Sequence, residues 1–281
     1  MLSRKCEEDS VKFQYSVLMS VYYKEKPEYL KQAIESILCQ TVQPDDFVLV
    51  CDGPLTAELD KVIVGYKDNP IFHVVRLKEN VGIGRAANVG IEHCKNELIA
   101  KMDSDDIAVP QRCEWQLHEF EMNPDLAVLG GQLYEFIDNI DNVVSKPVVP
   151  EKYNEIIKYA KRRDPFNNQT VMYKKSVVKD VGGYENLTRC EDYDLYARIL
   201  NAGYLCQNLN RFLVYYRLER DTYRRRKSSE NVKSFIKVRW KIHKSGFSSL
   251  MDFLIPTTAQ IIMYCAPNGL QKFVYEKILR K

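Results

Sequence analysis

Three acidic side chains lie within four residues, directly after an apolar run. The sequence KMDSDD occupies positions 101–106. Asp103 and Asp105 flank Ser104, so a bend in the chain can direct both carboxylates at one cation. Such hard oxygen ligands suit Mg²⁺ or Mn²⁺, which usually keep water ligands and also bind substrate phosphates. The motif predicts a divalent-cation site; an Asp-rich turn that caps a following helix is the alternative.

A second polar motif, Asp52-Gly53-Pro54, follows another apolar run. The Asp52 carboxylate can accept a hydrogen bond from a nucleotide base or ribose, and Gly53 permits close approach of the backbone. The same three residues also make an ordinary turn. By itself this motif favours the turn.

The segment NVGIGRAAN at 80–88 resembles a phosphate-binding loop. Gly82 and Gly84 permit a tight loop into a helix N-terminus, where backbone N–H groups and the helix dipole favour phosphate. Arg85 could add a charge-assisted contact to a phosphorylated donor. The segment predicts a phosphate site at the start of this helix.

The same loop supports a competing interpretation. Gly82, Gly84 and Ala87 match the form G-x-G-x-x-A, and Asp103 stands at a suitable distance for the acidic residue of a dinucleotide fold. An NAD-type oxidoreductase is therefore the main alternative. Against it, the loop follows the third predicted strand rather than the first, and a dinucleotide site has no need for Asp105 beside Asp103.

A further acidic pair, Glu191-Asp192, opens a predicted helix. A carboxylate at this place can take the proton from an attacking hydroxyl as a general base. Acidic residues in a first turn also favour the helix dipole without any catalytic role. Both interpretations stay open at this point.

Several motifs are missing from the sequence. There is no G-x-x-x-x-G-K-[ST] loop and no G-x-S-x-G elbow, which argues against P-loop NTPases and α/β-hydrolases. The four histidines have no metal-ligand spacing, which argues against a zinc site. A sugar nucleotidyltransferase would need a glycine-rich loop after its first strand, and VYYKEKPEY supplies none.

These motifs require a scaffold of alternating strands and helices. A helical pattern begins at Pro27, and another follows Gly84. Strands alternating with helices favour a largely parallel sheet that binds ligands beyond its carboxyl ends. The predicted strands are Ser16–Val21, Phe47–Cys51, Phe72–Leu77 and Leu98–Met102.

The second half of the chain is less regular. Strands are expected at Leu126–Leu129, Gln132–Ile137 and Thr170–Tyr173, and a helix at Glu191–Asn201. The composition becomes basic and helical near residue 217. We therefore predict a main domain at 1–216 and a C-terminal extension at 217–281.

The extension carries most of the charge asymmetry. The whole chain has a net charge of only +3, yet twelve Lys and Arg face three acidic residues between Arg211 and Lys244. Phe235, Trp240 and Phe247 interleave with these cations. They indicate either a membrane surface or a solvated helix face, and no nucleic-acid motif accompanies them. The sequence has no apolar signal segment, and its eight cysteines include no Cys-x-x-Cys pair. We therefore expect reduced, buried thiols and a cytoplasmic protein. If the basic segment does bind a membrane surface, the protein would lie peripherally on the inner face of the cell membrane.

Taken in order, these motifs resemble a family 2 glycosyltransferase with the GT-A fold. The resemblance covers about residues 15 to 216 and implies an α/β fold with a Rossmann-like, mostly parallel sheet flanked by helices. Within this family, the chain resembles bacterial enzymes that build capsular, exopolysaccharide or O-antigen units, often on a polyprenyl-diphosphate carrier. The matching segments are SVLMSVYYKEKPEYLKQAIESILCQT, FVLVCDGP, NVGIGRAANVGI, IAKMDSDDIAVPQR, FNNQTVMYKKS and GGYENLTRCEDYDLYARIL.

The resemblance also implies roles for individual residues. Asp52 would contact the base, usually uracil, and Asp105 would be the more direct metal ligand of the pair with Asp103. Asp192 would be the catalytic base of the Glu191-Asp192 motif. The residues expected at the nucleotide donor are Ser20, Tyr22, Glu25, Asp52, Arg85, Asn88, Asp103 and Ser104.

The implied activity is inverting transfer of a single sugar from a nucleotide-diphosphate sugar, with Mn²⁺ or Mg²⁺. The donor would be a UDP-hexose or UDP-N-acetylhexosamine, and the acceptor a glycan or a polyprenyl-diphosphate-linked sugar. The Q-x-x-R-W motif of processive members is missing, because neither Gln207 nor Arg211 is followed by tryptophan. A non-catalytic nucleotide-binding protein stays an alternative beside the oxidoreductase.

Overall fold

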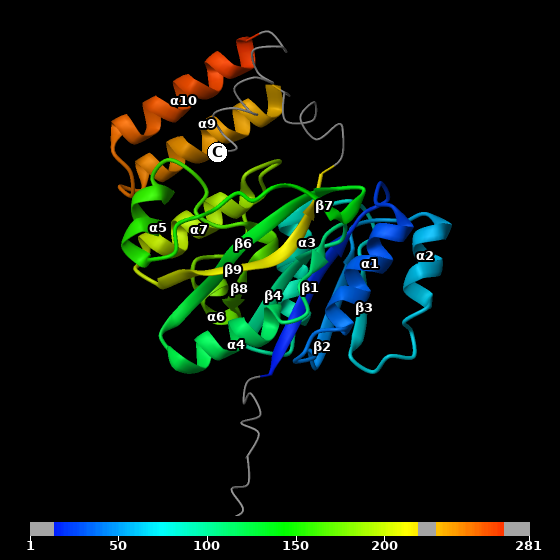
Figure 1. The fold of residues 1–281 in the computed structure, drawn as a ribbon. Helices are drawn as coiled ribbons and strands as arrows, with labels where there is room; N and C mark the ends of the chain where they lie inside the picture. The colour runs from blue at the N-terminus through cyan, green and yellow to red at the C-terminus, as the bar shows by residue number, and fades with distance from the viewer. Residues whose placement is uncertain (1–13, 219–228, 267–281) are drawn as a thin grey trace, which may run out of the picture.

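The computed structural model describes residues 14–218 and 229–266 (Figure 1). Residues 219–228, part of the basic segment between Arg211 and Lys244, lie outside this description. The described strands form one sheet in the order β3-β2-β1-β4-β8-β6-β9-β5, with β7 paired to β6. The strands are β1 (Tyr15–Val21), β2 (Asp46–Cys51), β3 (Phe72–Arg76), β4 (Leu98–Asp103), β5 (Ile107–Ala108), β6 (Leu126–Ile137), β7 (Asn139–Ser145), β8 (Met172–Lys174) and β9 (Leu205–Arg217).

Most of the sheet is parallel. Strands β3, β2, β1 and β4 are parallel to one another, β8 runs antiparallel to both β4 and β6, and β9 returns parallel to β6. The carboxyl ends of β1, β2 and β4 therefore meet at one edge, where Ser20 pairs with Asp103 in the β1–β4 register. The predicted α/β class with a mostly parallel sheet is confirmed.

Helices cover both faces of the sheet. Strand β1 shows why: Val17, Met19 and Val21 face one apolar core, and Leu18 faces the other. Helices α1, α2 and α4 pack on the first core, and α3, α5, α6 and α7 on the second. The helices are α1 (Pro27–Leu38), α2 (Ala57–Val64), α3 (Ile83–His93), α4 (Arg112–Met122), α5 (Tyr153–Ala160), α6 (Lys175–Asp180), α7 (Glu191–Asn201), α9 (Ser229–Lys244) and α10 (Leu250–Cys265).

Gly90 lets α3 pack closely on the sheet. A Cβ atom at this position would lie 2.2 Å from Leu18 Cδ1 and 2.8 Å from Val50 Cγ2, both in the apolar core. We expect Gly90→Val to reduce the free energy of unfolding by about 1–3 kcal/mol, because the added carbons overpack this contact. Urea unfolding would measure the change. Val89→Ile on the same helix, beside an open hollow, is the control; equal stability of the two variants would contradict the packing argument.

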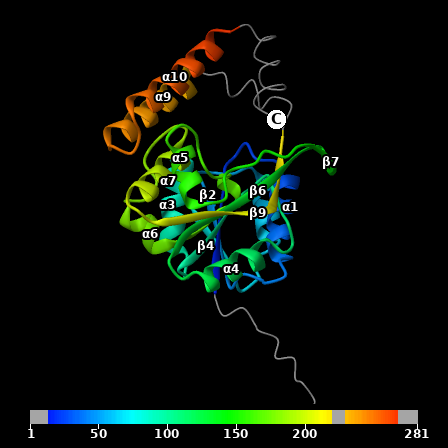
Figure 2. The ribbon, with the colours of Figure 1, turned by 60° about the vertical axis from the view of Figure 1, so that its left-hand side comes forward.

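The last two helices of the described residues, α9 and α10, lie outside the sheet and its covering helices. Helices α9 and α10 form a hairpin that lies beyond the edge of the sheet toward which β1 and β4 run, and both views place it outermost (Figures 1 and 2). No helix in the described part of the chain is long and apolar enough to cross a membrane. The boundary expected between residues 216 and 217 stays a prediction; β9 ends at Arg217.

The cysteine prediction is wrong in one respect. The seven cysteines among the described residues are free, as expected, but Cys39 and Cys265 are exposed rather than buried. Cys39 lies just after the last residue of α1, and Cys265 ends the outermost helix. At both places the helix ends leave the side chain in solvent.

Candidate active site

The acidic turn after β4 begins with a charge pair. Asp103, the last residue of β4, accepts a hydrogen bond from Lys101 Nζ at 2.7 Å. Lys101 is buried inside the strand. Burial lowers the pKa of its ammonium group, but the neighbouring carboxylates, Asp103 foremost and then Asp192 and Glu191, together raise the pKa above its ordinary value. The sequence prediction assigned no role to Lys101, although a lysine within a buried strand is unusual enough to have signalled one.

Asp105 lies in the same turn among other carboxylates. Its pKa is raised to about 7, first by burial and then by the negative charges of Glu25 and Asp103. Glu25, from the loop after β1, accepts a hydrogen bond from Ser104 Oγ at 2.8 Å. Three carboxylates and a hydroxyl therefore lie close together at the end of β4, and their roles in binding a metal or a nucleotide stay predictions.

This convergence fits a divalent cation. The candidate ligand atoms are all oxygen. Burial first, and then the charges of Glu25 and Asp103, raise the pKa of Asp105, so a bound cation would stabilise its ionised form. Among the described residues, no group of three or more His, Cys, Asp or Glu side chains is arranged to hold a metal ion. A cation held by Asp103 and Asp105 would thus take its other ligands from water and substrate phosphate, as Mg²⁺ commonly does.

Asp106 has a structural role in the same turn. It is fully buried and its Oδ1 accepts a hydrogen bond from the backbone N–H of Arg217 at 2.9 Å. The Arg217 guanidinium donates to the Asp105 carbonyl oxygen at 2.8 Å and lies 4.0 Å from the ring centre of Tyr29. Arg217 at the end of β9 therefore fixes the acidic turn from the strand that pairs with β5, a contact that sequence spacing did not reveal.

Both carboxylate oxygens of Asp52 accept hydrogen bonds from the protein's own backbone. Its Oδ1 accepts a hydrogen bond from the backbone N–H of Val81 at 2.7 Å, and its Oδ2 accepts one from Gly82 at 3.1 Å. Asn80 Nδ2 donates back to the Asp52 carbonyl oxygen at 3.2 Å. Asp52 therefore holds the glycine-rich loop at the N-terminus of α3. A contact with the base stays a prediction.

The start of α3 lies against the start of α7. A Cβ atom on Gly84 would lie 3.0 Å from the Glu185 carbonyl oxygen and 3.5 Å from Glu191 Cβ, so only glycine permits this approach without displacement. Gly82 has φ +91°, which also favours glycine. Arg85, in the first turn of α3, is exposed. The predicted phosphate loop and the predicted base are thus neighbours, although about a hundred residues separate them in the sequence.

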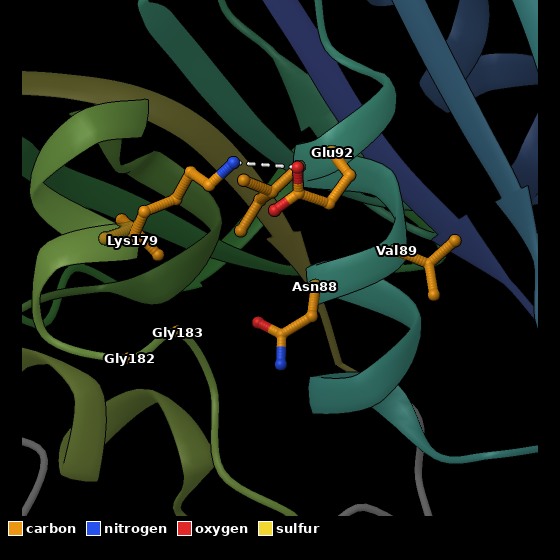
Figure 3. Close-up of a pocket in the computed structure, with 8 residues that line it drawn as sticks. Asn88, Val89, Glu92, Lys179, Gly182 and Gly183 are labelled. Carbon is orange, nitrogen blue, oxygen red and sulfur yellow. Dashed lines mark hydrogen bonds and ion pairs between the residues drawn. The ribbon is translucent and has the colours of Figure 1, made fainter.

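Asn88 holds the loop that leads to α7. Its Oδ1 accepts a hydrogen bond from the Tyr184 N–H at 2.8 Å, and its Nδ2 donates to the Tyr184 carbonyl oxygen at 2.7 Å. Figure 3 shows the side chain directed at the Gly182–Gly183 turn, beside a hollow of about 430 Å³ that the Lys179–Glu92 ion pair bridges. Both polar groups of the amide therefore serve the protein backbone; donor contact by Asn88 stays a prediction.

Glu191 and Asp192 open α7 as the sequence predicted. The residue before them, Cys190, has a left-handed backbone with φ +63°, an uncommon conformation for a residue with a side chain. Asp192 Oδ1 accepts a hydrogen bond from its neighbour Tyr193 N–H at 2.8 Å. The pKa of Asp192 is raised, chiefly by burial, with partial compensation from this hydrogen bond and from Lys101. Burial and the Asp192 charge likewise raise the pKa of Glu191 to about 7.

Lys101 connects the two acidic motifs. Its charge is stabilised by Asp103, by Asp192 and by Glu191, in that order. Asp164, on the loop after α5, adds another carboxylate to the group: its pKa is raised by burial and then by the charges of Asp192 and Glu191. The sequence prediction did not include Asp164. The buried ammonium group of Lys101 thus interacts with carboxylates of two segments, and Asp164 adds a third segment beside Glu191 and Asp192.

Two residues predicted to bind the nucleotide donor lie at the carboxyl end of β1. Ser20 is half-buried beside Asp103 on β1, and Tyr22 is 37% exposed just after the strand. Tyr22 packs edge-on against Tyr23, with ring centres 5.8 Å apart. An accessible aromatic ring next to the acidic turn suits stacking on a nucleotide base, and this role stays a prediction.

Comparison with known proteins identifies the chain. The model of the family described as glycosyl transferase family 2 matches residues 16–182. The chain is 34% identical to a UDP-Gal:alpha-D-GlcNAc-diphosphoundecaprenol beta-1,3-galactosyltransferase of Escherichia coli, over 98% of each chain. It is also 33% identical to the amylovoran biosynthesis glycosyltransferase AmsE of Erwinia amylovora, over 94% of this chain and 98% of the relative.

Solved structures show the same fold. Staphylococcus aureus TarS 1-349 in complex with UDP-GlcNAc has a TM-score of 0.67 at 16% identity, covering 93% of this chain and 73% of that one. The mannosyltransferase PcManGT of Pyrobaculum calidifontis in complex with GDP-Man and Mn²⁺ has a TM-score of 0.63 at 12% identity, covering 95% and 80%. The resemblance stated from the motifs is confirmed, and the chain belongs to glycosyl transferase family 2.

Proposed function

We propose that this glycosyltransferase adds one sugar, with inversion, from a UDP-sugar to a lipid-linked or glycan acceptor. The observation that carries the proposal is the meeting of two acidic motifs around Lys101 at the carboxyl edge of the sheet. One motif, at 103–105, suits a cation and a diphosphate. The other, at 191–192, suits proton transfer from an attacking hydroxyl.

The step is a single displacement at the anomeric carbon. The acceptor oxygen forms a bond to C1 while the bond from C1 to the diphosphate oxygen breaks, and the acceptor proton passes to an Asp192 carboxylate oxygen. The electron pair of the broken bond leaves with the nucleoside diphosphate. Attack from the face opposite to the leaving group inverts the anomeric centre, so an α-linked donor gives a β-linked product.

The chain's own groups prepare this step. The raised pKa of Asp192 favours proton uptake, and the positive charge of Lys101 offsets part of that rise and so favours the ionised carboxylate. Asp52 holds the N–H groups of Val81 and Gly82, and the following N–H groups, in the first turn of α3, would be available to phosphate. A divalent cation on Asp103 and Asp105 would act as a Lewis acid on the two phosphates.

Relatives support the choice of substrates. The Escherichia coli relative is named for a UDP-Gal donor and a diphosphoundecaprenol-linked acceptor, and this chain aligns with 98% of it. TarS was crystallised with UDP-GlcNAc. We infer a UDP-hexose or UDP-N-acetylhexosamine donor and an acceptor carried on a polyprenyl diphosphate, in the synthesis of a surface polysaccharide. Cytoplasmic placement stays a prediction.

The oxidoreductase alternative is not favoured. The glycine-rich segment follows β3, not β1, and Asp52 uses both of its carboxylate oxygens to hold that segment. Family membership also argues against it. A non-catalytic nucleotide-binding protein would have no use for the buried carboxylates at the start of α7.

Slow donor hydrolysis tests the proposal. A panel of UDP-sugars with Mn²⁺ and no acceptor should show release of UDP from one sugar, because water can replace the acceptor hydroxyl in the open site. NAD⁺ and GDP-mannose serve as controls. Hydrolysis of GDP-mannose but of no UDP-sugar would contradict the assignment of a UDP-sugar donor. If no nucleotide sugar is hydrolysed, the assignment of the active site is contradicted.

A further inference from the structure

Helix α10 presents an apolar face to solvent. Its one charged residue, Asp252, belongs to the capping box with Ser249 and is paired with Arg162 Nε at 2.6 Å. Thr257 is buried, and Phe253 packs on Trp240 of α9 with ring centres 5.2 Å apart, so this side faces the hairpin partner. An isolated surface helix normally turns its apolar side inward. On the outer side of α10, apolar side chains instead face solvent.

The outer side follows helical spacing. Met251, Ile255 and Ile262 lie at positions i, i+4 and i+11, opposite the contact with α9, and are 61%, 52% and 62% exposed. Leu254 and Ile261 widen the face and are also exposed. This apolar face, defined by these five residues, runs along the length of the helix. A contiguous exposed apolar patch of this kind marks an interaction site.

The neighbouring helix of the hairpin carries exposed cations. Lys233, Lys237 and Lys244 lie at i, i+4 and i+11 on α9 and are exposed, on the side away from the main domain. By contrast, the other basic residues of α9 turn inward. Arg239 is buried and donates to the Arg162 carbonyl oxygen, and Lys241 pairs with Asp194 of α7 at 2.8 Å.

The hairpin is fixed relative to the active site. Lys241 also pairs with Glu185, on the loop that leads to α7, and Asp252 ties α10 to the residues just after α5. Both ribbon views place α9 and α10 at the end of the molecule where the carboxyl edge of the sheet opens (Figures 1 and 2). The apolar face and the carboxylate cluster therefore lie at the same end of the molecule.

We propose that the apolar face of α10, together with the lysines of α9, docks on an anionic lipid bilayer. Apolar side chains would enter the interface between headgroups and acyl chains, and the lysines would contact the anionic headgroups. This inference deepens the proposed function, since an acceptor on a polyprenyl carrier would lie in that bilayer. The sequence prediction placed the contact in the basic segment alone; this proposal keeps three lysines of that segment and adds the apolar face of α10.

Vesicle sedimentation of the full chain tests the proposal. Wild-type protein should sediment with vesicles of phosphatidylcholine and phosphatidylglycerol at moderate salt. Ile255→Glu/Ile262→Glu should lower partitioning more than about tenfold. Lys233→Gln/Lys237→Gln/Lys244→Gln should lower it by about two orders of magnitude on anionic vesicles, at about fivefold for each lysine. Val64→Glu/Met122→Glu, at apolar residues 55% and 69% exposed outside the hairpin, should partition as wild type.

The outcomes are separable. Wild-type protein that stays in the supernatant with anionic vesicles overturns the proposal, as does an Ile255/Ile262 variant that still sediments. A dimer that this variant dissociates, without vesicle binding, would assign the face to a second copy of the chain and also overturn it. Donor hydrolysis in solution should be unchanged in all these variants, so loss of vesicle binding and failure of the proposed transferase activity are distinguished.

Discussion

Replacing Asp192 by asparagine is expected to reduce sugar transfer by about 10²–10⁴-fold, the usual contribution of a general base. Asparagine keeps the shape of the side chain and can still accept the hydrogen bond from Tyr193 N–H, but it cannot take the acceptor proton. Transfer of radiolabelled sugar to a lipid-linked acceptor would measure the rate. Binding of UDP in the presence of Mn²⁺ should be close to wild type, because the cation ligands are unchanged.

A second carboxylate provides the control for this variant. Asp180, at the surface end of α6, accepts a hydrogen bond from the Tyr204 hydroxyl and lies outside the carboxylate cluster. Asp180→Asn should leave transfer unchanged. If Asp192→Asn transfers sugar at the wild-type rate, Asp192 is not the general base, and Glu191→Gln would then be the next variant to measure.

Replacing Asp105 by alanine is expected to weaken UDP binding in Mn²⁺ by at least about tenfold, since loss of outer-sphere partners alone costs ~10–100-fold in metal affinity. In EDTA the same variant should bind UDP as the wild type does. The physical reason is the crowding of Asp105 with Glu25 and Asp103, where a cation offsets the repulsion. Calorimetric titration of UDP in both buffers measures the difference.

The comparison of the two buffers separates two explanations. An equal loss of affinity in Mn²⁺ and in EDTA would assign Asp105 to the architecture of the turn rather than to a cation. Asp106→Asn is the structural reference, because Asp106 binds the Arg217 backbone and lies fully buried. We expect that variant to lose affinity equally in both buffers. Asp68→Ala, at an exposed residue, should change neither.

Local sequence patterns predicted most of the first half of the fold. The four predicted strands correspond to β1 through β4, with ends that agree within one residue, and the helix at Glu191–Asn201 is α7. In these elements the local apolar pattern and the flanking turn residues are enough to predict the strand or helix. The second half was less well predicted. Strands expected at 126–129 and 132–137 are one strand, β6, and β9 was not predicted, because its mixed polar sequence is ordered by pairing with β6.

The position of Asp103 and Asp105 at the end of a buried strand was set by the sequence itself, because spacing along one strand and its turn is a local property. Which groups face that pair was decided only by the tertiary structure. The β1–β4 register brings Ser20 beside Asp103, and the packing of α3 on α7 brings Glu191 near Gly84. The outward apolar face of α10 likewise follows from which side of the helix meets α9. Such contacts join residues far apart in the chain, and no local pattern encodes them.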